Sequence, residues 1–258
     1  MDEDKAGRIL LENWRANTRI EALPEALRPR SRAAGYAIAA ALAKASGQPV
    51  AGWKIAATSK AGQKHINVPE PLGARILQDR LLTPGAAVPL GDNIMKVAEA
   101  EFAFSFGQAM PARAEAYSQE ETAAAVAALH LSIEVPDSRY KDFTKVGADQ
   151  LIADTACASW LVLGPPVAVE WRKLDLARHV VVGFRNGVEV SRGTGEAVLG
   201  GPLIALTWLV NEASAYCGGI SAGQFVTTGT CIAPFAIAPG DALRMDYGVL
   251  GSIEASVT

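Results

Sequence analysis

The 258-residue chain contains few cysteines, and their arrangement excludes two kinds of structure. Cys157, Cys217 and Cys231 are odd in number and share no Cys-x-x-Cys or Cys/His spacing. A disulfide framework normally uses an even set of cysteines, and a structural zinc site needs closely spaced ligands. We therefore expect neither, and we interpret the three cysteines as small core residues in a reducing compartment.

The chain also lacks an excess of charge of either sign. Its formal net charge is -3, from 24 Lys and Arg against 27 Asp and Glu, and these residues are scattered along the sequence. Nucleic-acid-binding surfaces and polybasic membrane patches need clustered positive charge. We therefore predict no nucleic-acid partner and no membrane partner.

Long hydrophobic runs are missing as well. Residues 1–5, Met-Asp-Glu-Asp-Lys, do not have the basic and apolar regions of a signal peptide, and no run of about 18 apolar residues follows. An internal repeat, which would indicate a solenoid, is also absent. With half of its residues hydrophobic, the chain can bury a large core, so we expect a globular protein. The lack of a signal peptide and of a long apolar run indicates the cytoplasm.

Local patterns predict a mixed order of helices and strands. Apolar residues at helical spacing indicate helices over residues 4–16 and 31–46, and the capping box Ser118-Gln119-Glu120-Glu121 predicts a helix that runs to about Leu129. Residues 59–79 are predicted to contain a short helix followed by a loop, a candidate lid. Strands dominate after residue 95, with the clearest hairpin at Asn186-Gly187. This order favours a β-rich α+β fold over a doubly wound sheet.

The segment 96–106 carries two carboxylates at strand spacing. Alternation along a strand places Ala98, Ala100 and the phenylalanines that follow on one face, and Glu99 and Glu101 on the other. Their Cα atoms should lie about 7 Å apart, which allows both side chains to reach one hard cation such as Mg²⁺ or Mn²⁺. The alternative is an edge strand with two solvated glutamates.

A third carboxylate and a lysine occupy similar apolar surroundings. Glu134 lies between Ile133 and Val135, where burial is costly unless the charge has a partner. A metal shared with the first two glutamates would be one partner, and Arg139 or another base would be the alternative. Lys54 lies inside the apolar strand 50–57, where it either extends to water or directs a cation at an anionic substrate.

A loop offers a weaker catalytic candidate. His65 and Glu70 lie in the polar segment 59–79 and could form a water-activating pair. The alternative is that a lone His and a lone Glu in such a loop have no catalytic role.

Several motifs in the same order resemble the fumarylacetoacetate hydrolase superfamily, specifically its 2-keto-4-pentenoate hydratase branch. The motifs include Gly-Trp-Lys-Ile at 52–55, Lys-Val-Ala-Glu-Ala-Glu-Phe at 96–102, Ser-Ile-Glu-Val-Pro-Asp-Ser-Arg at 132–139, Gly-Glu-Ala-Val-Leu-Gly-Gly-Pro at 195–202, Thr-Gly-Thr at 228–230 and Pro-Gly-Asp at 239–241. The resemblance implies a curled mixed β-sheet with flanking helices over residues 50–258, an N-terminal helical arm over residues 1–49, and a homo-oligomer.

The same resemblance implies the site. Glu99, Glu101 and Glu134 match the family's ligands for one Mg²⁺ or Mn²⁺, and Lys54 matches its active-site lysine. Thr230 and the backbone of Gly229 match a contact to the substrate carboxylate, and Asp79 matches a recurrent acidic position that we expect to be catalytic.

The implied reaction is the addition of water to a 2-hydroxy-2,4-dienoate of the 2-keto-4-pentenoate type, giving a 4-hydroxy-2-oxo acid, as in aromatic catabolism. Three alternatives stay open: a 2-oxo-3-hexenedioate (4-oxalocrotonate) decarboxylase, a C–C bond hydrolase of a 2,4-dioxo acid, and a noncatalytic partner subunit. Three positions depart from the family pattern: Leu72 where some hydratases have aspartate, Thr155 where many members have asparagine, and Glu196 where a small residue is usual. We therefore expect an intact metal site inside altered substrate-binding walls.

Overall fold

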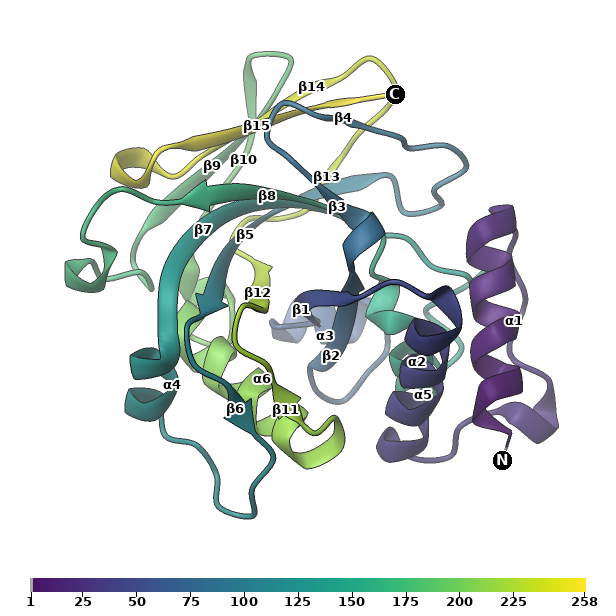
Figure 1. Cartoon of the computed structure of the whole chain (residues 1–258). Helices are drawn as coiled ribbons and strands as arrows, with labels where there is room; N and C mark the ends of the chain where they lie inside the picture. The colour runs from purple at the N-terminus through teal and green to yellow at the C-terminus, as the bar shows by residue number, and fades with distance from the viewer. Residues whose placement is uncertain (1) are drawn as a thin grey trace.

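The computed structural model describes residues 2–258, and its N-terminal helices lie together at one side of a β-rich body (Figure 1). Helices α1 (Glu3–Ala16) and α2 (Arg32–Ser46) pack against each other, and α2 packs against α5 (Ala148–Ala153). The side chains of Asp2 and Ser31 cap the two helices by accepting backbone N–H groups. The helices expected over residues 4–16 and 31–46 are confirmed. The predicted boundary between the N-terminal arm and the following domain, between residues 49 and 50, lies where the link after α2 meets β1. The division into two domains stays a prediction.

A curled mixed sheet forms the body and confirms the predicted α+β fold (Figure 1). Its strand order is β2-β1-β12-β5-β7-β8-β3, and β13 pairs with the beginning of β5. The bounds are β1 (Val50–Ala56), β2 (Leu72–Leu77), β3 (Leu81–Leu82), β5 (Val97–Phe106), β7 (Val126–Val135), β8 (Trp160–Pro166), β12 (Phe225–Thr230) and β13 (Phe235–Ala236). Strand β5 runs antiparallel to both β12 and β7, so the segment with the two glutamates lies inside the sheet and not at its edge.

A second sheet has the order β10-β9-β14-β15-β4, and a short pair joins β6 to β11. The bounds are β4 (Ala87–Val88), β6 (Met110–Pro111), β9 (Val180–Arg185), β10 (Val188–Thr194), β11 (Gly219–Ile220), β14 (Ala242–Asp246) and β15 (Ser252–Val257). The β9–β10 turn has positive φ at both Asn186 (54°) and Gly187 (79°), which confirms the predicted hairpin.

Helices α3 (Lys60–His65), α4 (Gln119–Ala125) and α6 (Pro202–Tyr216) complete the structure. Helix α6 begins with a proline at its first turn and buries Leu206, Leu209 and Val210 in the main hydrophobic core. By length and composition alone, Gly195–Tyr216 could cross a membrane, but 44% of its most apolar window is buried inside the protein.

Two local predictions are wrong. Helix α4 has the predicted capping box but ends at Ala125, because β7 begins at Val126 and its residues pair with β5, with Leu129 opposite Phe104. Tertiary pairing here overrides the helical preference of alanine. Residues 72–77, expected to be loop, form β2 antiparallel to β1, with Ala74 opposite Lys54. The prolines just before Leu72 are typical of a loop, so the sequence did not indicate this strand.

Candidate active site

Three carboxylates converge at the junction of β5 and β7. Glu99 and Glu101 lie on β5, and the register places Glu134 of β7 directly opposite Glu99. One carboxylate oxygen from each residue lies within 4.8 Å of the others. Like charges on directly opposed strand positions destabilise a sheet, so this arrangement needs positive charge between or beside the carboxylates.

The burial of these carboxylates increases their need for a positively charged partner. Glu101 and Glu134 are 0% and 2% exposed, whereas Glu99 is half-buried and faces a cavity. Within residues 2–258, Glu101 Oε1 and Glu134 Oε2 are buried and accept no hydrogen bond. Unpartnered buried oxygens are costly and call for an explanation. An all-oxygen donor set with free buried oxygens fits a hard divalent cation.

The protonation of the cluster reflects the same repulsion. Burial and the nearby charge of Glu134 raise the pKa of Glu99 to about 7, although Lys54 acts in the opposite direction. Burial, Glu134 and Glu99 raise the pKa of Glu101 well above its ordinary value. Glu99 and Glu101 therefore hold a proton more strongly than ordinary glutamates when no further positive charge lies beside them.

Lys54 supplies the positive charge that the protein itself places at the cluster. Its Nζ lies 2.5 Å from Glu134 Oε1, and the side chain is only 3% exposed. Burial alone would lower the pKa of Lys54, but Glu134, Glu99 and Glu101 outweigh that effect and raise it. Lys54 is therefore a buried ammonium, and the alternative in which it extends to water is wrong. Glu134 does pair with a base, but that base is Lys54, because Arg139 pairs with Asp154 instead.

A cavity of about 680 Å³ opens beside the cluster. Lys54 and Glu99 lie at its buried part, whereas the side chains of His65, Arg192 and Glu196 lie at exposed positions around it. Its volume is that of a small-molecule site. A ligand in this cavity would have one end near the carboxylates and Lys54, and the other end toward solvent.

Gly229 and Thr230, at the end of β12, lie beside the same cluster. The backbone N–H of Gly229 donates to Glu101 Oε2 at 3.0 Å, so it holds a cluster carboxylate and is not free for a substrate carboxylate. Thr230 lines the cavity, and its hydroxyl donates to the carbonyl of Ile232 at 2.8 Å. The substrate contact expected for Thr230 stays a prediction.

Other candidate residues are not brought into the cavity together. Asp79 lies on an exposed 3₁₀ turn between β2 and β3, with one oxygen 3.7 Å from Arg80 Nε, and it is not among the cavity-lining residues. Its predicted catalytic role therefore receives no support from its position. Glu70 pairs with Arg32 at 2.8 Å, so it does not form the water-activating pair with His65, which lines the cavity without it.

The three positions that depart from the family pattern lie in different surroundings. Leu72 is fully buried beside Ile66 and Val68 in a small hydrophobic cluster. Thr155 accepts a hydrogen bond from Arg139 at 3.0 Å, in the loop under the cavity wall. Glu196 is exposed at the cavity. Of the three, Glu196 is the one whose side chain lies at the cavity.

One wall of the cavity was not predicted. It includes Met95, Pro136, Ala156 and Cys157, which precede or follow the strands that carry the charged residues. Thr155, Ala156 and Cys157 all have positive φ, between 45° and 62°, a strained backbone for residues with side chains. The signal in the sequence was the run of small residues after Asp154, which marks a loop but does not indicate what the loop faces.

Gly229→Ala tests how closely the end of β12 packs against Thr58. Gly229 has φ +94°, and a Cβ there would lie 2.3 Å from Thr58 Oγ1. Gly229→Ala should therefore cost about 2 kcal/mol or more in the free energy of unfolding, because backbone strain and a steric clash combine. Gly187→Ala is the matched control, since it has φ +79° with open space around it. Equal losses in thermal unfolding of the two variants would contradict this packing.

The sequence is similar to one protein family and to several enzymes of known name. The model of the fumarylacetoacetate (FAA) hydrolase C-terminal family matches residues 41–258. A 2-keto-4-pentenoate hydratase from Burkholderia vietnamiensis is 32% identical over 220 residues, covering 84% of this chain and 81% of that protein. A 4-oxalocrotonate decarboxylase from Pseudomonas putida is 32% identical over 209 residues, covering 81% of this chain and 78% of that protein.

A solved structure has nearly the same fold over the whole chain. The 4-oxalocrotonate decarboxylase from Pseudomonas putida G7, complexed with magnesium and adipate, matches with a TM-score of 0.89 at 25% identity. The match covers 99% of this chain and 97% of that chain.

Proposed function

Because the chain belongs to the fumarylacetoacetate hydrolase family, whose C-terminal model matches residues 41–258, we propose that it is a metal-dependent hydratase. Its substrate would be a 2-hydroxy-2,4-dienoate, which gains water to become a 4-hydroxy-2-oxo acid. The observation that carries this proposal is the buried cluster of three carboxylates with Lys54 beside it at a cavity of small-molecule size. Relatives named as hydratases, from Burkholderia vietnamiensis and Comamonas testosteroni, support the reaction type.

Glu99, Glu101 and Glu134 would hold the Mg²⁺ or Mn²⁺ ion. Their all-oxygen chemistry, and the two buried oxygens without hydrogen-bond partners among the described residues, support such an ion. When bound, the ion would supply Lewis-acid chemistry at the 2-oxo acid end of the substrate. Gly229 would keep Glu101 oriented through its N–H, in the way that outer hydrogen bonds orient metal ligands.

Lys54 would stabilise negative charge on the C2 oxygen of the substrate. Its ammonium is buried, so the interaction with a developing oxyanion is stronger than it would be in water. In the overall change, the C2 hydroxyl loses a proton and C5 gains one, giving a conjugated enone. The oxygen of water then bonds to C4 while C3 takes a proton. The added water would enter from the exposed side of the cavity, where His65 and Glu196 lie.

A 4-oxalocrotonate decarboxylase is the second candidate, because relatives and a solved structure with this name match equally large parts of the chain. The buried ammonium of Lys54 would then stabilise the enolate that remains when CO₂ departs. A C–C hydrolase would require His65 and Glu70 as its water-activating pair, and it is disfavoured because Glu70 is paired with Arg32 and not with His65. The noncatalytic partner is disfavoured because the carboxylates and Lys54 are all present and assembled. The homo-oligomer and the cytoplasmic location stay predictions.

The reaction and its need for a metal can be tested together. We expect the purified protein with Mg²⁺ to remove the ultraviolet absorbance of 2-hydroxypenta-2,4-dienoate and to form a product heavier by one water. A chelator should lower the rate about 100-fold or more, and added Mg²⁺ should restore it. The parallel assay offers 2-oxo-3-hexenedioate and measures CO₂ release.

The two assays separate the candidates. Turnover that resists the chelator would contradict the metal site. Release of CO₂ from the dicarboxylate without hydration of the dienoate would replace the hydratase with the decarboxylase.

A further inference from the structure

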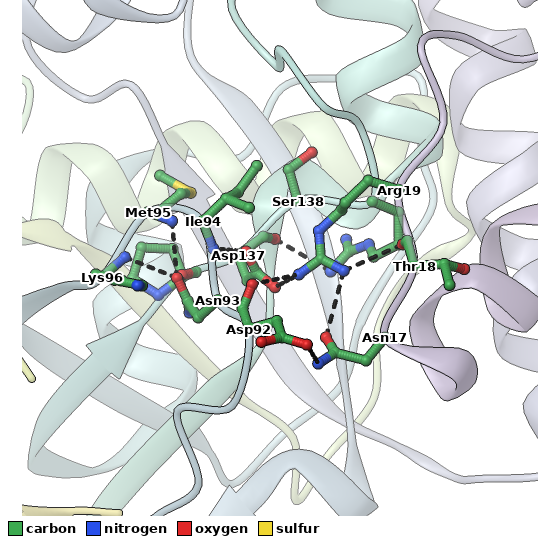
Figure 2. A network of polar contacts seen from close by, with 12 residues as sticks. Asn17, Thr18, Arg19, Asp92, Asn93, Ile94, Met95, Lys96, Asp137 and Ser138 are labelled. Atoms are coloured by element: carbon green, nitrogen blue, oxygen red, sulfur yellow. Dashed lines mark hydrogen bonds and ion pairs between the residues drawn. The ribbon is translucent and has the colours of Figure 1, made fainter. Parts of the chain in front are cut away.

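A mostly buried arginine, Arg19, joins the N-terminal arm to the body of the protein (Figure 2). Arg19 follows α1, and its side chain is only 10% exposed. Its guanidinium forms an ion pair with Asp137, just after β7, and donates to the carbonyl of Asp92 at 3.4 Å. Removing one member of a buried ion pair is far more costly than removing an exposed one, so this contact is a strong link.

Asp137 connects Arg19 to two loops, one before β5 and one around Cys157. Its second carboxylate oxygen accepts the N–H of Ile94 at 3.0 Å, and its own backbone N–H donates to the carbonyl of Cys157 at 3.0 Å. The same carboxylate therefore contacts the arm on one side and the loop before β5 on the other (Figure 2).

Asn93 fixes the loop before β5 to the segment that follows β7. Its Nδ2 donates to the carbonyl of Pro136 at 2.8 Å, while its Oδ1 accepts the N–H groups of Met95 and Lys96 at 2.8 and 2.7 Å. Lys96 has φ +47°, a conformation that a lysine adopts only when its surroundings impose it. The chain therefore enters β5 in one imposed geometry.

These loops form a wall of the cavity and lead directly into the carboxylate cluster. Met95, Pro136 and Cys157 line the cavity. Glu99 follows Lys96 by three residues, and Glu134 precedes Pro136 by two. A change in the spacing between the loop before β5 and the segment after β7 would therefore change the spacing of the carboxylates of Glu99 and Glu134, which lie on opposed positions of β5 and β7.

We propose that Arg19 is a positioning residue for the metal site, acting through Asp137 on the loops that carry Glu99 and Glu134 into the cluster. The metal part of this inference rests on the proposed function, whereas the effect on the loops does not. Arg19 lies outside residues 41–258, which the family model matches, so the arm adds this support to the site from outside that range.

The test compares Arg19→Met with Glu21→Gln. Glu21 pairs with Lys141 at 2.8 Å, so it also links the arm to the chain after β7, but both side chains are exposed and Asp137 is not involved. Titration with Mn²⁺ alone measures metal affinity, and hydrogen exchange of residues 92–97 measures the order of the loop. We expect Arg19→Met to lower Mn²⁺ affinity about tenfold and to speed exchange of the Ile94 amide about tenfold.

The controls keep a positioning role distinct from a loss of fold. Glu21→Gln should leave both quantities within about twofold of the wild type. Arg19→Lys should recover part of the loss, and it replaces Arg19→Met if that variant does not fold. Arg19→Met combined with Asp137→Asn should weaken Mn²⁺ binding by less than the product of the two single losses, because both residues act through one contact.

Unchanged Mn²⁺ affinity and unchanged exchange in a folded Arg19 variant would overturn the inference, and so would equal losses in Glu21→Gln. If the wild type binds no Mn²⁺ but the Arg19 variant still exchanges faster, the metal site is refuted and the role of Arg19 in ordering the loops is supported.

Discussion

Glu101→Gln should bind Mg²⁺ about 100-fold more weakly than the wild type and lose about a thousandfold in rate, yet unfold at no lower temperature. Glu101 is 0% exposed, with one oxygen held by the Gly229 N–H and the other unpaired. Glutamine keeps an acceptor for Gly229 and carries no charge, so it takes residue 101 out of the mutual repulsion that raises the pKa of Glu101. The metal-free protein should therefore be as stable or more stable, by about 1 kcal/mol.

Glu212→Gln is the control for this variant. Glu212 is also a mostly buried carboxylate, 12% exposed, but it pairs with Arg32 and accepts from the Tyr36 hydroxyl at 2.8 Å, outside the cavity-lining set. Its substitution should lower stability by about 3 kcal/mol and leave Mg²⁺ affinity unchanged. Calorimetric titration and thermal unfolding of both variants measure the contrast. Full activity of Glu101→Gln would show that Glu101 is not part of the active site.

Lys54→Met should lose about a thousandfold in rate but bind Mg²⁺ at least as tightly as the wild type. The ammonium of Lys54 occupies Glu134 Oε1 and competes with a metal for that carboxylate. Without it, the cluster is more negative, and a divalent cation becomes the remaining partner for Glu134. The metal-free variant should therefore be destabilised by about 3 kcal/mol, and Mg²⁺ should restore much of that stability.

Lys173→Met provides the comparison, because Lys173 is an exposed lysine that does not line the cavity. It should change neither rate nor metal affinity by more than about twofold. Single-turnover rates and Mg²⁺ titrations at constant ionic strength distinguish the two lysines. If Lys54→Met lost metal affinity and kept its rate with saturating Mg²⁺, Lys54 would be a structural partner of Glu134 and not a catalytic group.

The charged centre of the site could be predicted from the sequence because its signals are local. Glu134 between Ile133 and Val135, and Lys54 inside an apolar strand, are each costly to bury alone, so each requires a partner. Strand alternation alone places Glu99 and Glu101 on one face. The structure brings these four residues together, as expected.

The surrounding contacts could not be predicted because they depend on pairing between distant segments. Nothing near Gly229 indicates that its N–H holds Glu101, more than a hundred residues earlier in the chain. Arg19 resembles any surface arginine until the loops around Asp92 and Asp137 are seen to enclose it (Figure 2). Asp79 shows the converse, since the family resemblance gives it a catalytic role that stays a prediction, and its exposed turn lies outside the cavity lining.

The place of β12 in the sheet sets the order in which the site can assemble during synthesis. Strand β12, residues 225–230, lies between β1, which carries Lys54, and β5, which carries Glu99 and Glu101. Until the ribosome has made β12, these two strands have no common neighbour, and the lysine and the carboxylates cannot be held together. Such long-range pairing forms slowly and late. The complete cluster, with Lys54 and the Gly229 N–H beside the three carboxylates, can therefore form only after residues 225–230 have been made.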